Sequence, residues 1–179
     1  FGTHRGLGVV TLHRQSNVDD PEVLAQVVEL LIEVSKRMPL VCPLHPRTRA
    51  NLERFNLVEK FAMARIALLP PQGYLEMLGL MDSAAVVLTD SGGIQEETTA
   101  LSVPCLTMRE NTERPITVEE GTNTLVGRDR DLIIQSVEAI QRLQDFTERV
   151  GFFEAVEDRR QLGVHEDALG LRAADARRH

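Results

Sequence analysis

The chain has 179 residues, of which 42% are hydrophobic and 26% charged, a balance that excludes a disordered or low-complexity chain and predicts one globular domain. Its formal net charge of −7 argues against binding to nucleic acid as the main function, although a local anion site stays compatible with it. No apolar run reaches the roughly 18 to 20 residues that cross a membrane, and the two cysteines, Cys42 and Cys105, lie in apolar stretches. We therefore expect a cytoplasmic protein with two buried free thiols and no membrane partner.

Short β-branched runs alternate with helical patterns along the chain. Strands are predicted at 7–12, 40–44, 65–69, 84–89, 103–107 and 124–126. Helices are predicted over 20–37, 49–55, 73–81, 92–101 and 131–143. This order predicts an α/β fold, a Rossmann-like open parallel sheet with helices on both faces. The pattern loosens later, so we expect a Rossmann-like domain over 1–147 and a divergent tail, helical or frayed, over 148–179.

The strongest local motif is T-D-S-G-G-I-Q-E-E at 89–97, where a buried strand turns directly into a helix. Gly92 and Gly93 let the backbone approach a ligand, and the free N–H groups at the helix start attract phosphate oxygens. Ser91 can add a hydroxyl contact, and Glu97 lies where its carboxylate could accept hydrogen bonds from sugar hydroxyls. The alternative is an ordinary helix start with a tight turn, because the motif is neither a Walker sequence nor a complete GxGxxG.

Two histidines and an arginine-rich segment follow other predicted strands. His13-Arg14 ends the first strand and His45-Pro46 the second, so both histidines should lie at the carboxyl edge of the sheet, where they could bind phosphate or transfer protons. The segment 109–115 follows the fifth strand, and its arginines could bind a diphosphate or simply form surface ion pairs with Glu110, Glu113 or Glu119. The sequence has no metal-ligand spacing and no nucleophile elbow, so neither a metal site nor a serine hydrolase is expected.

These motifs, taken together and in order, resemble the C-terminal half of UDP-N-acetylglucosamine 2-epimerases from about residue 8 to 145. The blocks that carry the resemblance are T-L-H-R-Q-S-N-V-D at 11–19, L-H-P at 44–46, L-P-P-Q-G-Y-L at 69–75, L-T-D-S-G-G-I-Q-E-E at 88–97, M-R-E-N-T-E-R-P at 108–115 and G-T-N at 121–123. The resemblance implies a glycosyltransferase-B-type architecture of two Rossmann-like domains, with the substrate in the cleft between them. This chain would be one of the two.

The resemblance also implies roles for individual residues. The UDP-binding residues would be His13, Gln72, Ser91, Gly92, Gly93, Glu97 and Arg114. Among them, 91–93 would hold the diphosphate, Glu97 the ribose hydroxyls and the loop around Gln72 the uracil. His13 would contact the phosphate region and support catalysis. Residues that match Arg14 and His45 contact a second, regulatory UDP-sugar in bacterial non-hydrolysing members of the family.

The activity that the resemblance implies is the interconversion of UDP-GlcNAc and UDP-ManNAc. The family abstracts the proton at C2 of the sugar, eliminates UDP and adds it back on the other face, without a metal or another cofactor. Its acidic catalytic residues belong to an N-terminal domain that this chain lacks, so we expect the chain alone to be inactive; the family commonly forms homodimers. Two alternatives are a non-catalytic UDP-sugar-binding or regulatory module and a hydrolysing relative that releases ManNAc and UDP.

Overall fold

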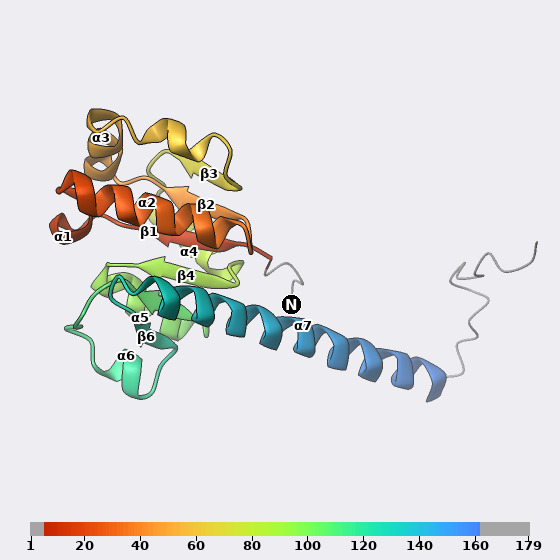
Figure 1. Cartoon of the computed structure of the whole chain (residues 1–179). Helices are drawn as coiled ribbons and strands as arrows, with labels where there is room; N and C mark the ends of the chain where they lie inside the picture. The colour runs from red at the N-terminus through yellow and green to blue at the C-terminus, as the bar shows by residue number, and fades with distance from the viewer. Residues whose placement is uncertain (1–5, 162–179) are drawn as a thin grey trace, which may run out of the picture. The chain divides into compact units, whose positions relative to one another are not determined.

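The computed structural model describes the backbone of residues 6–161 and the side chains of residues 6–147, and it contains a six-stranded parallel sheet (Figure 1). The strands are β1 (Gly8–Thr11), β2 (Leu40–Pro43), β3 (Ile66–Leu69), β4 (Val86–Thr89), β5 (Cys105–Thr107) and β6 (Asn123–Leu125). They lie in the order β3-β2-β1-β4-β5-β6, and each neighbouring pair is parallel. This order is that of a doubly wound Rossmann sheet, and the predicted fold class is confirmed.

The helices connect these strands. They are α1 (Gln15–Val18), α2 (Pro21–Ser35), α3 (Pro46–Arg54), the 3₁₀ helix η1 (Val58–Phe61), α4 (Tyr74–Asp82), α5 (Gly92–Ala100), α6 (Ile116–Glu119) and α7 (Arg130–Gln161). The start of α2 follows from its sequence, because the side chain of Asp20 accepts hydrogen bonds from the backbone N–H groups of Glu22 and Val23, and Pro21 occupies the first helical position.

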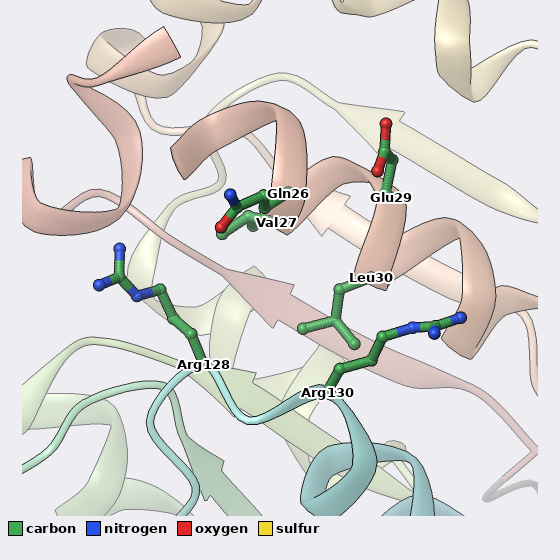
Figure 2. A pocket seen from close by; sticks show the side chains of 6 residues that line it. All are labelled: Gln26, Val27, Glu29, Leu30, Arg128 and Arg130. Carbon is green, nitrogen blue, oxygen red and sulfur yellow. The ribbon is translucent and has the colours of Figure 1, made fainter. Parts of the chain in front are cut away.

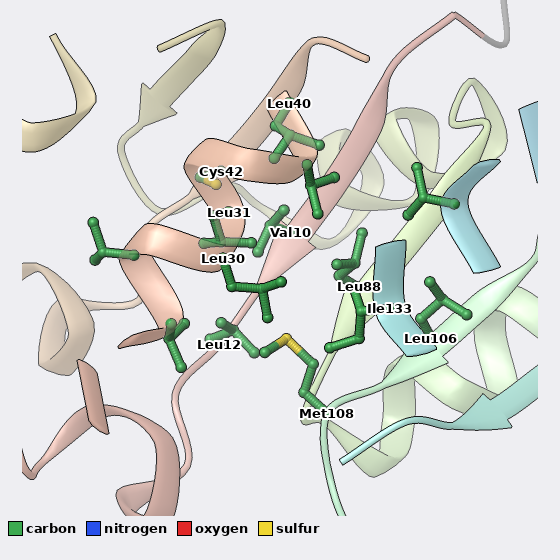
Figure 3. Close-up of a cluster of buried hydrophobic side chains, with 14 of the residues drawn as sticks. Val10, Leu12, Leu30, Leu31, Leu40, Cys42, Leu88, Leu106, Met108 and Ile133 are labelled. Atoms are coloured by element: carbon green, nitrogen blue, oxygen red, sulfur yellow. The ribbon is translucent and has the colours of Figure 1, made fainter. Parts of the chain in front are cut away.

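Two hydrophobic clusters lie on opposite faces of the sheet. On one face Leu30 and Leu31 of α2 and Ile133 of α7 pack with Val10 and Leu88 of the central strands (Figure 3). On the other face the clustered residues come from β1, β4 and the segments around α4 and α5; they include Val9, Val87, Met81 and Ile94. Since helices cover both faces, all four residues of β4 are buried, which explains why its sequence is a continuous run rather than an alternating one.

The elements differ from the predicted ones mainly at short segments and at the C-terminal helix. The four-residue helices α1, η1 and α6 were not predicted, because four residues are too few to display helical periodicity. Helix α7 begins at Arg130, one residue before the predicted start, and continues to Gln161 rather than ending near 143. The chain divides into two compact units, Phe1–Gln141 and Arg142–His179. The backbone of the expected tail is therefore helical over 148–161, and 162–179 lie outside the described residues.

Both cysteines are buried free thiols, as predicted. Burial raises the pKa of Cys42 to about 12, so this thiol is neutral at physiological pH. Within residues 6–161 no helix is both long and apolar enough to cross a membrane.

Candidate functional site

The loops that follow β1 and β4 leave the sheet where the strand order reverses. β1 pairs with β2 on one side and with β4 on the other. The connection after β1 leads to α2 on one face of the sheet, whereas β4 continues into α5 on the other. Ligands of open α/β sheets bind in the crevice outside the strand ends at such a switch point. The carboxyl ends of β1 and β4 are therefore the candidate site.

Asp90, directly after β4, joins the two loops. Its carboxylate is fully buried and accepts hydrogen bonds from the backbone N–H groups of His13 (3.1 Å) and Arg14 (3.0 Å) and from the side-chain amide of Asn17 (3.0 Å). The guanidinium Nε of Arg14 donates to the Asp90 carbonyl oxygen at 3.0 Å. These bonds compensate the cost of burying a carboxylate and fix His13 at the edge of the sheet. The sequence signal for this role, an acidic residue that ends an apolar strand, was not used in the prediction.

A pocket of about 230 Å³ opens at this edge and brings together four of the predicted residues: His13, His45, Gln72 and Ser91. The rings of His13 and His45 lie 5.3 Å apart between centroids, and the side-chain amide of Gln72 donates to the Pro70 carbonyl at 2.7 Å. The apolar part of the wall includes Leu44, Pro71, Met77 and Ile94. A pocket with an apolar wall and a few polar groups suits a flat heterocyclic ring.

The start of α5 is open toward solvent beside this pocket. Ser91 is the N-cap residue, and its hydroxyl makes no capping bond, while its backbone N–H donates to Thr89 Oγ1 at 3.0 Å. A Cβ atom placed on Gly93 would meet nothing within 4 Å, and one on Gly92 would meet only a carboxylate oxygen of Glu113 at 3.8 Å. The first N–H groups of a helix lack partners within the helix and favour anions. This helix start therefore has both the room and the polarity for phosphate oxygens.

An ion-pair cluster lies over the same helix start. The side chain of Arg109, only 9% exposed, donates to the two carboxylate oxygens of Glu113 at 2.6 and 2.7 Å, and Arg14 lies 3.5 Å from one of them. Arg14, Arg109 and Arg128 also line a second pocket, of about 270 Å³. The ion-pair alternative for Arg109 is thus confirmed, with Glu113 as its partner. The hydrogen bonds from Arg109 lower the pKa of Glu113 to about 2.

This lowered pKa predicts an acid-sensitive contribution to stability. Glu113 is ionised in the folded protein down to about pH 2, whereas the unfolded chain binds a proton near pH 4.5. The free energy of unfolding should therefore fall as the pH falls from about 4.5 toward 2, and Glu113→Gln should make this dependence shallower. The pH dependence of the unfolding free energy will not vanish in this variant, because hydrogen bonds from Lys36 and Arg37 lower the pKa of Glu33 to about 2 as well. Urea unfolding at a series of pH values measures the slope; an unchanged slope in Glu113→Gln would contradict the prediction.

Arg114 and Glu97 lie outside the pocket that holds His13. The guanidinium Nε of Arg114 lies 2.8 Å from a carboxylate oxygen of Glu96, so this arginine also forms an ion pair. Glu97 is partly buried, and desolvation, followed by the nearby charge of Glu96, raises its pKa. The structure places both residues around α5, the helix that begins at Gly92 and Gly93.

A buried polar network anchors the segment that carries these arginines. Gln95 of α5 is fully buried, and its Oε1 accepts hydrogen bonds from Thr112 Oγ1 (2.5 Å) and Asn123 Nδ2 (3.1 Å). Thr112 Oγ1 in turn accepts from the backbone N–H of Arg114 at 2.9 Å. The network therefore fixes where the backbone of Arg114 lies. Sequence reasoning missed it, although polar residues on the inner face of a helix are a recognisable signal.

A larger cavity, of about 420 Å³, lies between α2 and the start of α7 (Figure 2). Its lining residues are Gln26, Val27, Glu29, Leu30, Arg128 and Arg130, and none of them was predicted as a site residue. Among the described residues no group of three or more His, Cys, Asp or Glu side chains is arranged to hold a metal ion. The predicted residues His13, His45, Gln72 and Ser91 line the pocket at the switch point instead.

Known proteins resemble this chain in sequence and in fold. The sequence profile of the UDP-N-acetylglucosamine 2-epimerase family matches residues 2–154. A UDP-N-acetylglucosamine 2-epimerase from Methanocaldococcus jannaschii is 46% identical over 133 residues, which are 73% of this chain and 36% of that protein. The crystal structure of the M. jannaschii UDP-GlcNAc 2-epimerase in complex with UDP-GlcNAc and UDP superposes with a TM-score of 0.71 at 44% identity, over 75% of this chain and 38% of the other.

Two further relatives show how far the similarity extends. A UDP-2,3-diacetamido-2,3-dideoxy-D-glucuronate 2-epimerase from Pseudomonas aeruginosa is 45% identical over 132 residues, 73% of this chain and 36% of that protein. A UDP-glucose:anthocyanidin 3-O-glucosyltransferase in complex with UDP shares the fold at 17% identity, with a TM-score of 0.57 over 87% of this chain and 36% of the other. The chain thus spans about a third of the length of the relatives it matches.

Proposed function

Because this chain belongs to the UDP-N-acetylglucosamine 2-epimerase family, we propose that it is the UDP-binding domain of an enzyme that interconverts UDP-GlcNAc and UDP-ManNAc. The observation that carries the proposal is the grouping of His13, His45, Gln72 and Ser91 around one pocket beside the open N-terminus of α5. The side of the pocket lined by Gln72 takes the uracil, and the helix start, with His13 and Ser91 beside it, takes the diphosphate.

The remaining predicted residues fit around the same ligand. Gly93 and Glu97 are four residues apart on α5, so they share one face of the helix, and a nucleotide whose diphosphate lies over Gly93 can extend along that face. Glu97 accepts hydrogen bonds from the ribose hydroxyls. Arg114 is paired with Glu96, so part of this ion pair must break before the guanidinium of Arg114 can bind the diphosphate.

The reaction requires a second domain. The acids that abstract the C2 proton and assist elimination of UDP belong to that domain, and the elimination gives 2-acetamidoglucal, to which UDP adds back on the other face. The chain described here retains UDP through these steps, so that binding energy from the nucleotide keeps UDP and the glucal oriented toward each other while the sugar reacts.

Arg14 and His45 contact a regulatory UDP-sugar, as matching residues do in bacterial non-hydrolysing members of the family. The enzyme pairs with a second copy of itself. It works in the cytoplasm, which the two buried free thiols support.

The 179-residue chain should bind UDP and fail to epimerise UDP-GlcNAc, because it supplies the nucleotide-binding groups and lacks the opposing acids. Calorimetry measures UDP binding, and proton NMR of the anomeric signals measures turnover. Epimerisation by this chain alone would contradict the divided site.

The full-length protein should convert UDP-GlcNAc to UDP-ManNAc in the same NMR assay. Release of free ManNAc and UDP would instead identify a hydrolysing relative. UDP-sugar binding without turnover in the full-length protein would favour a non-catalytic module.

A further inference from the structure

The carboxylate of Asp90 contacts the imidazole of His13 as well as the backbone of its loop. Oδ1 lies 3.2 Å from His13 Nδ1 and 3.1 Å from the His13 backbone nitrogen. Oδ2 lies 3.0 Å from the backbone nitrogen of Arg14 and 3.0 Å from Asn17 Nδ2. The backbone N–H of His13 is shared with Oδ2, at 3.2 Å, whereas the imidazole contact belongs to Oδ1.

This contact determines which ring nitrogen carries the proton. Asp90 is 0% exposed and accepts hydrogen bonds from three N–H donors, so its carboxylate acts as an acceptor. A carboxylate oxygen 3.2 Å from Nδ1 repels a lone pair there, so it favours a proton on Nδ1 and leaves the lone pair of the neutral ring on Nε2. The side chain of His13 is 39% exposed and lines the pocket, so Nε2 is the nitrogen available to a ligand.

We infer that Asp90 is a positioning residue: it holds His13 in the Nδ1–H tautomer, so that Nε2 can exchange a proton with the nucleotide sugar bound at the switch point. The inference rests on the proposed function for the proton exchange, whereas the tautomer is a property of the protein itself. If Asp90 served only to link the loops after β1 and β4, its hydrogen bonds to the backbone N–H groups and to Asn17 would be enough. The additional contact with Nδ1 orients the ring, as the carboxylate does in an Asp-His pair.

Asp90→Asn in the full-length protein tests this assignment. Three donors converge on Oδ2, from His13 N at 3.2 Å, Arg14 N at 3.0 Å and Asn17 Nδ2 at 3.0 Å, so the amide oxygen of the new residue should take that position. Its NH₂ group then faces His13 Nδ1 and donates to it. The ring is driven to the Nε2–H tautomer, in which Nε2 has no lone pair and can no longer accept a proton.

Nitrogen-15 NMR of the His13 ring at about pH 8, where an ordinary imidazole is neutral, reports the tautomer directly. We expect protonated Nδ1 in the wild-type protein and protonated Nε2 in Asp90→Asn. The kcat of the variant should fall by roughly 10²- to 10⁴-fold, the usual contribution of a positioned acid or base. Its affinity for UDP should change little, because an Nε2–H group still donates to a phosphate oxygen.

Asn17→Ala is the matched control. Asn17 is as buried as Asp90 and bonds to the same carboxylate, but to Oδ2 rather than to the oxygen that faces the imidazole. This variant should lower the melting temperature while it keeps the wild-type tautomer and kcat. A loss of kcat in Asn17→Ala as large as that in Asp90→Asn would assign Asp90 a structural role and overturn the inference.

The nitrogen-15 spectrum of the wild-type protein tests the predicted tautomer of His13 even if Asp90→Asn does not fold. A neutral His13 ring protonated at Nε2 in the wild-type protein would overturn the positioning role. Lack of turnover of nucleotide sugar by the wild-type full-length protein would instead contradict the proposed function, and the two failures are therefore distinguishable.

Discussion

Gly93→Asp in the full-length protein should abolish detectable UDP binding and leave the fold at least as stable as before. Gly93 is the second residue of α5, and a side chain there would enter open space, since nothing lies within 4 Å of its Cβ position. A carboxylate in the first turn interacts favourably with the helix dipole, by about 0.3 to 1 kcal/mol. The same carboxylate would occupy the proposed diphosphate position and repel the phosphates. We expect UDP affinity to fall at least roughly a hundredfold, the equivalent of one lost charge-assisted contact or more.

Two further variants separate the causes of this loss. Gly93→Asn adds nearly the same volume without the charge and should weaken UDP binding less. Gly79→Asp adds the charge at an exposed position of α4, where a Cβ also meets nothing within 4 Å, and should leave UDP affinity unchanged. Calorimetry with UDP and thermal unfolding of each variant give both quantities. UDP binding by Gly93→Asp at wild-type affinity would remove the α5 N-terminus from the site.

The sheet could be predicted because its signals are local. The run at 84–88 is apolar throughout and includes two β-branched valines, and the Asp20-Pro21 pair marks the start of α2 from two neighbouring residues. The end of α7 could not be predicted in this way. Its periodic apolar pattern fades after 143, yet the helix passes through Gly151 and continues to Gln161, because neither weak amphipathicity nor a single glycine by itself ends a helix that lacks a proline.

The site could be predicted in position but not in its internal bonds. His13, His45 and Ser91 each follow a strand, and a parallel sheet brings the ends of its strands to one edge, so their grouping follows from topology. The contact between the Asp90 carboxylate and the ring of His13 joins residues 77 positions apart, and it depends on a side-chain direction that no local pattern encodes. The same reason applies to Arg114, whose partner Glu96 lies on another element.

The remaining large effect concerns Glu97, whose carboxylate lies one turn beyond Gly93 on α5. If it accepts hydrogen bonds from the ribose hydroxyls, Glu97→Ala in the full-length protein should weaken UDP binding by roughly tenfold to a hundredfold, since hydrogen bonds to charged groups contribute about 1.5 to 3 kcal/mol. Desolvation and the charge of Glu96 raise the pKa of Glu97 in the free protein, so donors from a ligand would relieve part of the cost of keeping this carboxylate ionised.

A double-mutant cycle with 2′-deoxy-UDP separates this contact from a structural effect. Removal of the 2′-hydroxyl should lower the affinity of the wild-type protein for the nucleotide. It should lower the affinity of Glu97→Ala much less, because the variant no longer has the acceptor that the hydroxyl uses. Glu96→Ala is the matched control: it removes the neighbouring carboxylate, which is bound to Arg114, and should leave the difference between UDP and 2′-deoxy-UDP as it is in the wild type. Equal losses for the two nucleotides in Glu97→Ala would mean that Glu97 shapes the helix without touching the ribose, and the sugar edge of the nucleotide would then have to lie along another face of α5.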